Sequence, residues 1–260
     1  MFSLDNNLAL AKKAALEAGR VAMSYFQTST YEIKDKSFNN PVTTADHKAN
    51  KIIKDILFQD HLGCGWLSEE TVDSEDRLSK DYVWVVDPID GTKEFIEGIP
   101  QFSISIALVY LGNPIIGVIY NPSTDELFSA SKGMGSFYND KKVKCIEANK
   151  ELIALVSRSE MKRGLWDNYK KNFKELRPIG SVAYKIGLIG AGKADIFATL
   201  RPKNEWDICA GHCIINESGG VILDLYGKSI KYNQKNTLIQ QGLIAGSKNK
   251  ADSVLKIINI

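Results

Sequence analysis

The sequence lacks the features that mark membrane, secreted and nucleic-acid-binding proteins. No segment of its 260 residues approaches the run of about 20 apolar residues that a membrane-spanning helix needs. The N-terminal segment carries Asp5 and has no unbroken apolar run, which predicts no secretory signal. The formal net charge is only +2, so charge gives no reason to expect a nucleic-acid polymer or a membrane surface as partner.

Cysteine is scarce, with four residues in the chain. Cys64 and Cys145 lie far from each other and from the other two, which favours reduced thiols in a cytoplasmic protein over a disulfide framework. Cys209, His212 and Cys213 have a helical spacing that could imitate a zinc-binding face. Their neighbours are apolar and small, so packing in the core is the favoured interpretation.

The pattern of apolar residues predicts two halves of different class. Residues 1–145 read as an α+β half, with helices over 4–22 and 43–57 followed by an antiparallel meander of strands from residue 82. Residues 146–260 read as an α/β half, with helices over 165–173, 184–192, 206–218 and 250–258 between short strands. Nothing near residue 145 resembles a flexible linker, so one compact unit is expected.

Two aspartates stand at the end of a predicted buried strand in "WVVDPIDGTKEF", residues 84–95. Pro88 donates no hydrogen bond, so the chain is expected to leave the sheet directly after Asp87. Asp87 and Asp90 repel each other unless one holds a proton or a cation lies between them. Gly91 permits close approach of a ligand to the backbone. A site made of oxygen ligands selects a hard divalent ion such as Mg²⁺.

Other carboxylates could converge on the same site. Glu69 and Glu70 could equally be solvated loop charges, and Asp46 and Asp207 could simply favour the dipoles of the helices that they precede. If they converge, the chemistry is metal-assisted hydrolysis of a phosphate monoester. The Thr92 hydroxyl would then orient the attacking water. The amides of Gly91, Thr92 and Lys93 would face the phosphate oxygens.

Four segments resemble the motifs of the inositol monophosphatase family of Mg²⁺-dependent, lithium-sensitive phosphatases. "WVVDPIDGTKEF" is similar to the family's Trp-x-x-Asp-Pro-x-Asp-Gly-Thr motif, and "EWDICAGHCIINESGG" to its second motif, which begins Trp-Asp and ends in a Gly-Gly turn. "PVTTADHKAN" and "SEE" match two further motifs in the family's order. The resemblance covers nearly the whole chain. It implies a layered α-β-α-β-α sandwich and a homodimer.

The resemblance also implies roles for individual residues. Asp46, Glu69 and Thr92 form the expected catalytic set, and Gly91, Thr92 and Asp207 the expected contacts to the substrate. Two or three Mg²⁺ ions per site are expected. The implied metal ligands are Glu69, Asp87, the carbonyl of Ile89, Asp90 and Asp207.

Further residues bear on the identity of the substrate. Lys93 and Glu94 follow the Asp-Gly-Thr motif, as in the CysQ-type 3'(2'),5'-bisphosphate nucleotidases, which convert 3'-phosphoadenosine 5'-phosphate to AMP. Gly180 and Ser181 would then lie near the ribose or base. Lys185 would meet the second phosphate, or would be a solvated helix lysine.

Three alternatives stay open. Arg201 and Lys203 favour an anionic substrate, whereas Glu205, directly before Trp206, keeps binding of a polyol open. The chain could therefore be an inositol-1-monophosphatase or a broad sugar phosphatase, fructose-1,6-bisphosphatase included. In a different class, it could be a metal-binding regulatory protein without turnover. The presence of Thr92 and Asp46 beside every implied ligand argues against that class.

Overall fold

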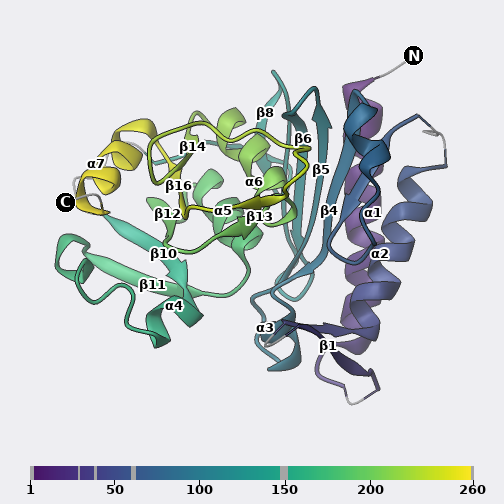
Figure 1. Ribbon diagram of the computed structural model, residues 1–260, viewed down its shortest axis with the longest axis horizontal. Coiled ribbons are helices and arrows are strands. Elements are labelled where there is room, and N and C mark those ends of the chain that lie inside the picture. Colours follow the sequence, from purple (N-terminus) through teal and green to yellow (C-terminus); the bar gives the residue numbers. More distant parts are fainter. Residues whose placement is uncertain (1–2, 29, 38–39, 60–62, 147–151, 259–260) are drawn as a thin grey trace.

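Two β-sheets and three layers of helices alternate in the computed structural model, which describes residues 3–28, 30–37, 40–59, 63–146 and 152–258 (Figure 1). Helices α1 (Leu4–Tyr25) and α2 (Thr44–Leu57) cover the outer face of the first sheet. Helices α5 (Val182–Gly190) and α6 (Glu205–Glu217) lie between the two sheets, and α7 (Lys248–Ile258) packs outside the second. The expected α-β-α-β-α sandwich is confirmed.

The first sheet has seven strands in sequence order. Neighbouring strands are antiparallel except the first pair, β3 and β4, which are parallel. Alanines on one side of α1 are fully buried, and their small side chains let the helix pack closely on the sheet. The strands are β3 (Gly65–Ser68), β4 (Tyr82–Asp90), β5 (Ser103–Tyr110), β6 (Asn113–Asn121), β7 (Glu126–Ser131), β8 (Gly135–Tyr138) and β9 (Lys141–Val143).

The second sheet has five strands in the order β11-β10-β12-β16-β14. Strand β10 is parallel to both of its neighbours, whereas β16 is antiparallel to both of its own. The alternation of strands and helices predicted for this half is therefore present, in a mixed sheet. The strands are β10 (Ile153–Ser157), β11 (Glu175–Ile179), β12 (Ile196–Thr199), β14 (Val221–Asp224) and β16 (Leu243–Gly246).

Short elements connect the layers. Two small antiparallel pairs stand apart from the main sheets, β1 (Ile33–Ser37) with β2 (Asn40–Thr43) and β13 (Lys203–Asn204) with β15 (Leu238–Ile239). The remaining elements are α3 (Thr92–Ile96), α4 (Arg158–Lys162) and the 3₁₀ turns η1 (Glu75–Ser79) and η2 (Lys170–Asn172). Across the described part of the chain, the helices are too short or too polar to cross a bilayer.

The helix predicted over 165–173 is wrong. Gly164, at a φ of 70°, follows α4, and the chain then continues in turns and the short η2. Trp166 is buried, donates its indole N–H to Glu160 (2.9 Å) and packs edge-on against Phe173 (ring centroids 6.0 Å apart). These tertiary contacts override the helical spacing of the aromatic residues.

Candidate metal centre and active site

Strand β4 delivers Asp87 and Asp90 to one end of the first sheet. Asp87 lies opposite Ser105 of β5 and Asp90 lies opposite Ser103, so β4 holds one residue more than β5 over this stretch. This is a β-bulge, which turns side chains from their regular alternation. The prediction that the chain leaves the sheet directly after Asp87 is wrong, because the bulge accommodates Pro88 inside the strand.

Glu69, Asp87 and Asp207 meet at this end of the sheet, and we call them the acid cluster. Each offers one carboxylate oxygen, and the three oxygens lie within 4.8 Å of one another. Glu69 directly follows β3, Asp87 lies on β4, and Asp207 lies in the first turn of α6. The cluster therefore joins residues from both predicted halves of the chain.

The pKa values of these acids reflect their crowding. Burial, and then the charges of Glu69 and Asp90, raise the pKa of Asp87 well above its ordinary value. Burial, and then the charges of Asp90 and Glu69, raise the pKa of Asp207 to about 8. Such acids are stable as anions only beside a cation. An all-carboxylate donor set of this kind fits Mg²⁺.

Three aspartates of the site each use one carboxylate oxygen at the start of a helix. The bonds run from Thr43 N to Asp46 Oδ2 (2.8 Å), from Asn204 N to Asp207 Oδ2 (3.0 Å) and from Ala183 N to Asp90 Oδ2 (2.6 Å). They satisfy amides that would otherwise lack a partner at the starts of α2, α6 and α5. The second oxygen of each carboxylate stays available to the site.

Thr92 lies between Asp46 and Ile89 of β4. Its hydroxyl oxygen is 3.2 Å from Asp46 Oδ1 and 3.1 Å from the carbonyl oxygen of Ile89. The hydroxyl can donate its one proton to either acceptor and still accept a bond from water. Burial raises the pKa of Asp46 to about 7 against the lowering effect of its hydrogen bonds. Asp46 is therefore tuned to take up a proton near neutral pH.

A cleft of about 490 Å³ opens over these residues. Besides acids it is lined by three cationic side chains, Lys93, Arg201 and Lys203. Glu94 also lines it but is paired with Arg158, whose Nη1 lies 2.8 Å from Glu94 Oε1. The complete lining is Pro41, Glu69, Asp87, Ile89, Asp90, Gly91, Thr92, Lys93, Glu94, Val182, Arg201, Pro202, Lys203, Asn204 and Asp207.

The residues predicted to hold ribose and the second phosphate lie behind Asp90, outside this lining. Lys185 is 2% exposed and donates to the carbonyls of Ile179 (2.8 Å) and Ser181 (2.7 Å). Ser181 is buried and donates its hydroxyl to Asp90 Oδ2 (2.5 Å). The amide of Gly180 donates to the side chain of Gln101 (2.8 Å). These contacts position Asp90 and give no support to the predicted contacts with substrate.

Glu205 also points away from the cleft. It is 1% exposed, and its two oxygens accept the backbone N–H groups of Asn233 (2.7 Å) and Gln234 (2.8 Å). The suggestion that it could hold sugar hydroxyls is therefore wrong, since both oxygens are already used. Sequence reasoning missed these partners, because no motif or spacing near residue 205 indicates a contact with residues 233 and 234.

The cysteine and histidine group on α6 is core. Cys209 and Cys213 are buried in the layer between the sheets, and His212 Nδ1 lies 2.7 Å from the Tyr232 hydroxyl. In the part of the chain that the structure describes, the acid cluster is the single group of acids, cysteines or histidines gathered closely enough to hold an ion. The zinc alternative thus has no support from the geometry.

Comparison with known proteins agrees with the motifs. The sequence model of the inositol monophosphatase family matches residues 3–259. The fructose-1,6-bisphosphatase/inositol-1-monophosphatase of Thermotoga maritima is 31% identical over 265 residues, covering 100% of this chain and 96% of that protein. The inositol-1-monophosphatase of Mesorhizobium japonicum is 34% identical over 227 residues, covering 83% of this chain and 84% of that protein.

A solved structure gives a third comparison. The crystal structure of CysQ from Bacteroides thetaiotaomicron superposes with a TM-score of 0.79 at 31% identity, covering 95% of this chain and 98% of that one. The chain belongs to the inositol monophosphatase family, and is a metal-dependent phosphatase acting on small phosphate esters.

Proposed function

We propose that this phosphatase hydrolyses 3'(2'),5'-bisphosphate nucleotides, releasing AMP and phosphate from 3'-phosphoadenosine 5'-phosphate. The observation that carries the proposal is the cationic lining of the cleft beside the acid cluster, formed by Lys93, Arg201 and Lys203. A substrate with two phosphate groups needs positive charge beyond the metal site, because the second group is not neutralised there.

The surroundings of the cleft support an anionic substrate over a polyol. Glu205, the acid that might have bound sugar hydroxyls, is turned away and fully used by backbone amides. Glu94 is partly neutralised by Arg158, so it weakens the positive character of the cleft less than a free carboxylate would. The Lys93-Glu94 pair after the Asp-Gly-Thr motif points the same way.

The proposed mechanism assigns the proton to Thr92 and Asp46. The acid cluster, with Asp90 and the Ile89 carbonyl, would hold Mg²⁺, which neutralises phosphate charge and makes water more acidic. Thr92 accepts a hydrogen bond from the attacking water and donates its own to Asp46, which takes up the proton. As water adds to phosphorus, the P–O ester bond breaks; the leaving oxygen takes up a proton from solvent to become the product alcohol, and Asp46 returns its proton to solvent.

The second candidate is an inositol-1-monophosphatase or sugar phosphatase. The names of two relatives favour it. The Mesorhizobium protein is named an inositol-1-monophosphatase, and the Thermotoga protein a fructose-1,6-bisphosphatase/inositol-1-monophosphatase. For inositol 1-phosphate it requires a cleft that tolerates an uncharged ring beside three cations, whereas the second phosphate of fructose 1,6-bisphosphate would meet those cations.

Steady-state kinetics with Mg²⁺ test the choice. We expect kcat/KM for 3'-phosphoadenosine 5'-phosphate to exceed that for inositol 1-phosphate and fructose 1,6-bisphosphate by about tenfold or more, or about 1.4 kcal/mol of transition-state discrimination. Arg201→Ala and Lys203→Ala should each lower the first value about fivefold and the inositol phosphate value less than about twofold. Lys228→Ala, an exposed lysine outside the cleft lining, serves as the matched control. A tenfold preference for inositol phosphate would overturn the proposal.

A further inference from the structure

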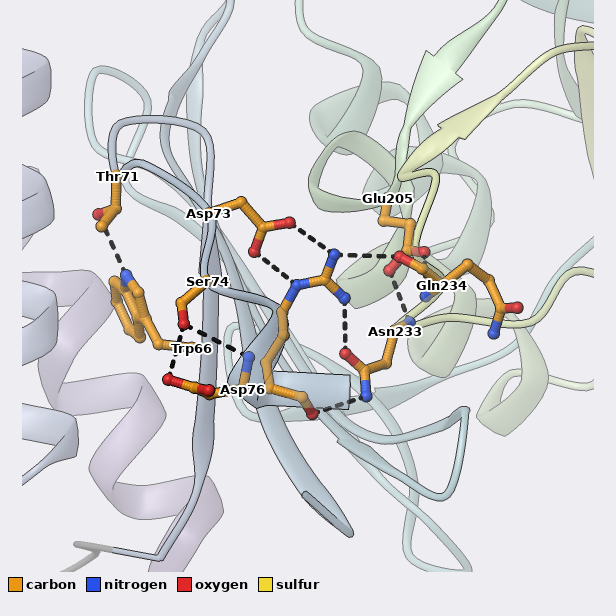
Figure 2. Close-up of polar contacts among 9 residues, drawn as sticks. Trp66, Thr71, Asp73, Ser74, Asp76, Glu205, Asn233 and Gln234 are labelled. Carbon is orange, nitrogen blue, oxygen red and sulfur yellow. Dashed lines mark hydrogen bonds and ion pairs between the residues drawn. The ribbon is translucent and has the colours of Figure 1, made fainter. Parts of the chain in front are cut away.

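A buried arginine, packed against Gly65 at the start of β3, joins the two halves of the chain. Arg77 lies in η1, is 2% exposed and makes a two-pronged ion pair with Asp73, with Nε to Oδ1 at 2.7 Å and Nη2 to Oδ2 at 2.8 Å. Figure 2 draws this network, with Asp73 on one side and Asn233, Gln234 and Glu205 on the other. The fork geometry of a guanidinium makes such pairs both strong and directional.

The rest of the guanidinium reaches the C-terminal half. Nη1 donates to Asn233 Oδ1 (2.7 Å) and Nη2 donates to the carbonyl of Gln234 (3.0 Å). The Asn233 side chain returns a bond from Nδ2 to the carbonyl oxygen of Arg77 (3.1 Å). Arg77 therefore holds residues 233–234 through three hydrogen bonds, two to the Asn233 side chain and one to the Gln234 backbone.

That backbone in turn fixes the start of α6. The amides of Asn233 and Gln234 donate to Glu205, and the amide of Glu205 donates to the carbonyl of Thr237 (3.0 Å). Strand β15, just beyond, pairs with β13, whose Lys203 lines the cleft. Asp207 of the acid cluster follows Glu205 by two residues on the same helical turn.

The other end of the network reaches the loop that carries Glu69. Asp73 follows Glu69 by four residues, and the loop between them is held by Trp66, whose indole N–H donates to Thr71 Oγ1 (3.1 Å). Glu69 and Asp207 thus come from different halves of the chain, and Arg77 connects the segments next to both. These two segments share no sheet and no helix.

We propose that Arg77 is a positioning residue for the metal site, and that it sets the separation of Glu69 and Asp207 on which metal affinity depends. The proposal rests on the proposed function only in taking the acid cluster as the metal site. Arg77 touches neither the ion nor the substrate. Groups that hold metal ligands from behind commonly change metal affinity by 10–100-fold when removed.

A lysine cannot replace this arginine. Its ammonium is a single point donor, so it can pair with Asp73 or reach Asn233 and Gln234, but it cannot hold both in a fixed plane. Arg77→Lys therefore keeps the buried charge while releasing the link between the halves. Asn233→Gly is a milder change, because glycine tolerates the φ of 58° found there and the backbone N–H to Glu205 remains.

The experiment measures Mn²⁺ binding by electron paramagnetic resonance of the free ion, well below the melting temperature of each variant. We expect Arg77→Lys to raise the Kd for Mn²⁺ about tenfold and Asn233→Gly about threefold. The Mg²⁺ concentration for half-maximal phosphate release should rise in parallel, while kcat at saturating Mg²⁺ stays within about twofold. An effect on affinity with little effect on kcat is the signature of positioning.

The matched control is Lys250→Met. It breaks another buried ion pair, Lys250 with Asp195, on the far side of the second sheet, so it should lower stability without moving the Kd. An unchanged Kd in Arg77→Lys, or an equal rise in Lys250→Met, would overturn the proposal and leave Arg77 as a stabilising contact alone. Wild-type protein that binds no Mn²⁺ would overturn it as well.

Mn²⁺ binding tests this proposal and substrate preference tests the proposed function, so the two can fail separately. Wild-type protein that binds Mn²⁺ but prefers inositol 1-phosphate would overturn the nucleotidase assignment. The comparison of Kd values between wild type and Arg77→Lys would still decide the role of Arg77.

Discussion

The protein buries acids in two places and treats them in opposite ways. In the acid cluster, Glu69, Asp87 and Asp207 face one another at the end of the first sheet. In the C-terminal half, Glu160 and Asp195 are 1% and 2% exposed, and we call them the paired acids; in the acid cluster Asp87 is buried to the same degree, whereas Glu69 and Asp207 are half-buried. Asp195 has Lys250 and the amide of Ile153 as partners, and Glu160 accepts from Trp166, Thr199 and the amide of Leu200.

The difference separates stability from function. Each of the paired acids is surrounded by donors, so its burial is compensated by the protein itself. In the acid cluster, burial and the charges of neighbouring acids raise the pKa values of Asp87 and Asp207, and an ion would compensate this crowded charge. Acids gathered against one another are therefore the part of this fold that points to chemistry.

Asp87→Asn should show the largest effect and should separate the two groups of acids. We expect kcat/KM to fall by about a thousandfold or more, because several kcal/mol of transition-state stabilisation depend on the ion. The free energy of unfolding without divalent metal should rise by about 1 kcal/mol as repulsion with Glu69 and Asp90 is removed. Chemical denaturation and phosphate release measure the two quantities. Near wild-type turnover would show that Asp87 is not a metal ligand.

Asp195→Asn should give the reverse result. It leaves Lys250 buried without its counter-ion, which typically costs about 3 kcal/mol of stability. Turnover at a temperature where the variant is folded should stay within about twofold, because the pair lies outside the cleft. Urea denaturation monitored by circular dichroism gives the stability. A large loss of turnover in the folded variant would contradict the division between the two groups.

Thr92→Ala sharpens the comparison within the site itself. In the proposed mechanism the hydroxyl orients water and relays its proton to Asp46, and loss of such a group costs about a hundredfold in kcat. The Kd for Mn²⁺ should change less than about threefold, since the acid cluster is intact. Thr92→Ser, which keeps the hydroxyl, should recover most of the activity. Equal losses of turnover and of metal affinity in Thr92→Ala would mean that the hydroxyl serves the ion instead.

The pH dependence of stability should be the smallest and most diagnostic effect. The folded pKa values of Asp207, about 8, and Asp46, about 7, lie above their unfolded values, so the folded metal-free protein binds protons that the unfolded chain releases. Its stability should fall as pH rises from about 4, near the unfolded values, to about 7 for Asp46 and about 8 for Asp207, by up to about 1.4 kcal/mol per pH unit for each acid. Saturating Mg²⁺ should flatten this slope, because the ion competes with those protons.

A histidine opposes this trend in the lower part of the window, below about pH 6.5. Burial lowers the pKa of His212 to about 4, so below about 6.5 the unfolded chain gains a proton there that the folded one resists. That contribution destabilises the protein as pH falls and opposes the trend of the acids. A slope in the metal-free protein that does not respond to Mg²⁺ would remove the acid cluster as its source.

The fold could be predicted wherever the sequence pattern is local. The alanine stripe of α1, the meander from β4 onward and the Gly219-Gly220 end of α6 were all readable from spacing or turn residues. The helix over 165–173 could not be judged in this way. Its aromatic residues do face one cluster, but Trp166 is placed by Glu160, whose position depends on β12 and its neighbours.

The same distinction applies to the site. The acid cluster could be predicted because each of its residues belongs to a motif and lies at the end of a strand or the start of a helix, where sequence signals are strong. Lys185 could not be placed because α5 is buried on all sides, and no periodicity tells which face meets the cleft. Arg77 gave no signal at all, since Asn233 is 156 residues away in the chain.

The aspartates that hold helix starts have a consequence for how an ion is captured. Asp90 and Asp207, two of the implied metal ligands, are each tied at one oxygen, so their rotation was restricted when the chain folded. Part of the entropy cost of ordering these side chains is thus met before any ion arrives. The rate of ion binding should then be limited by the loss of water from the hydrated ion. Ligands held at a fixed spacing should also favour small Mg²⁺ over Ca²⁺, which needs longer bonds and more ligands.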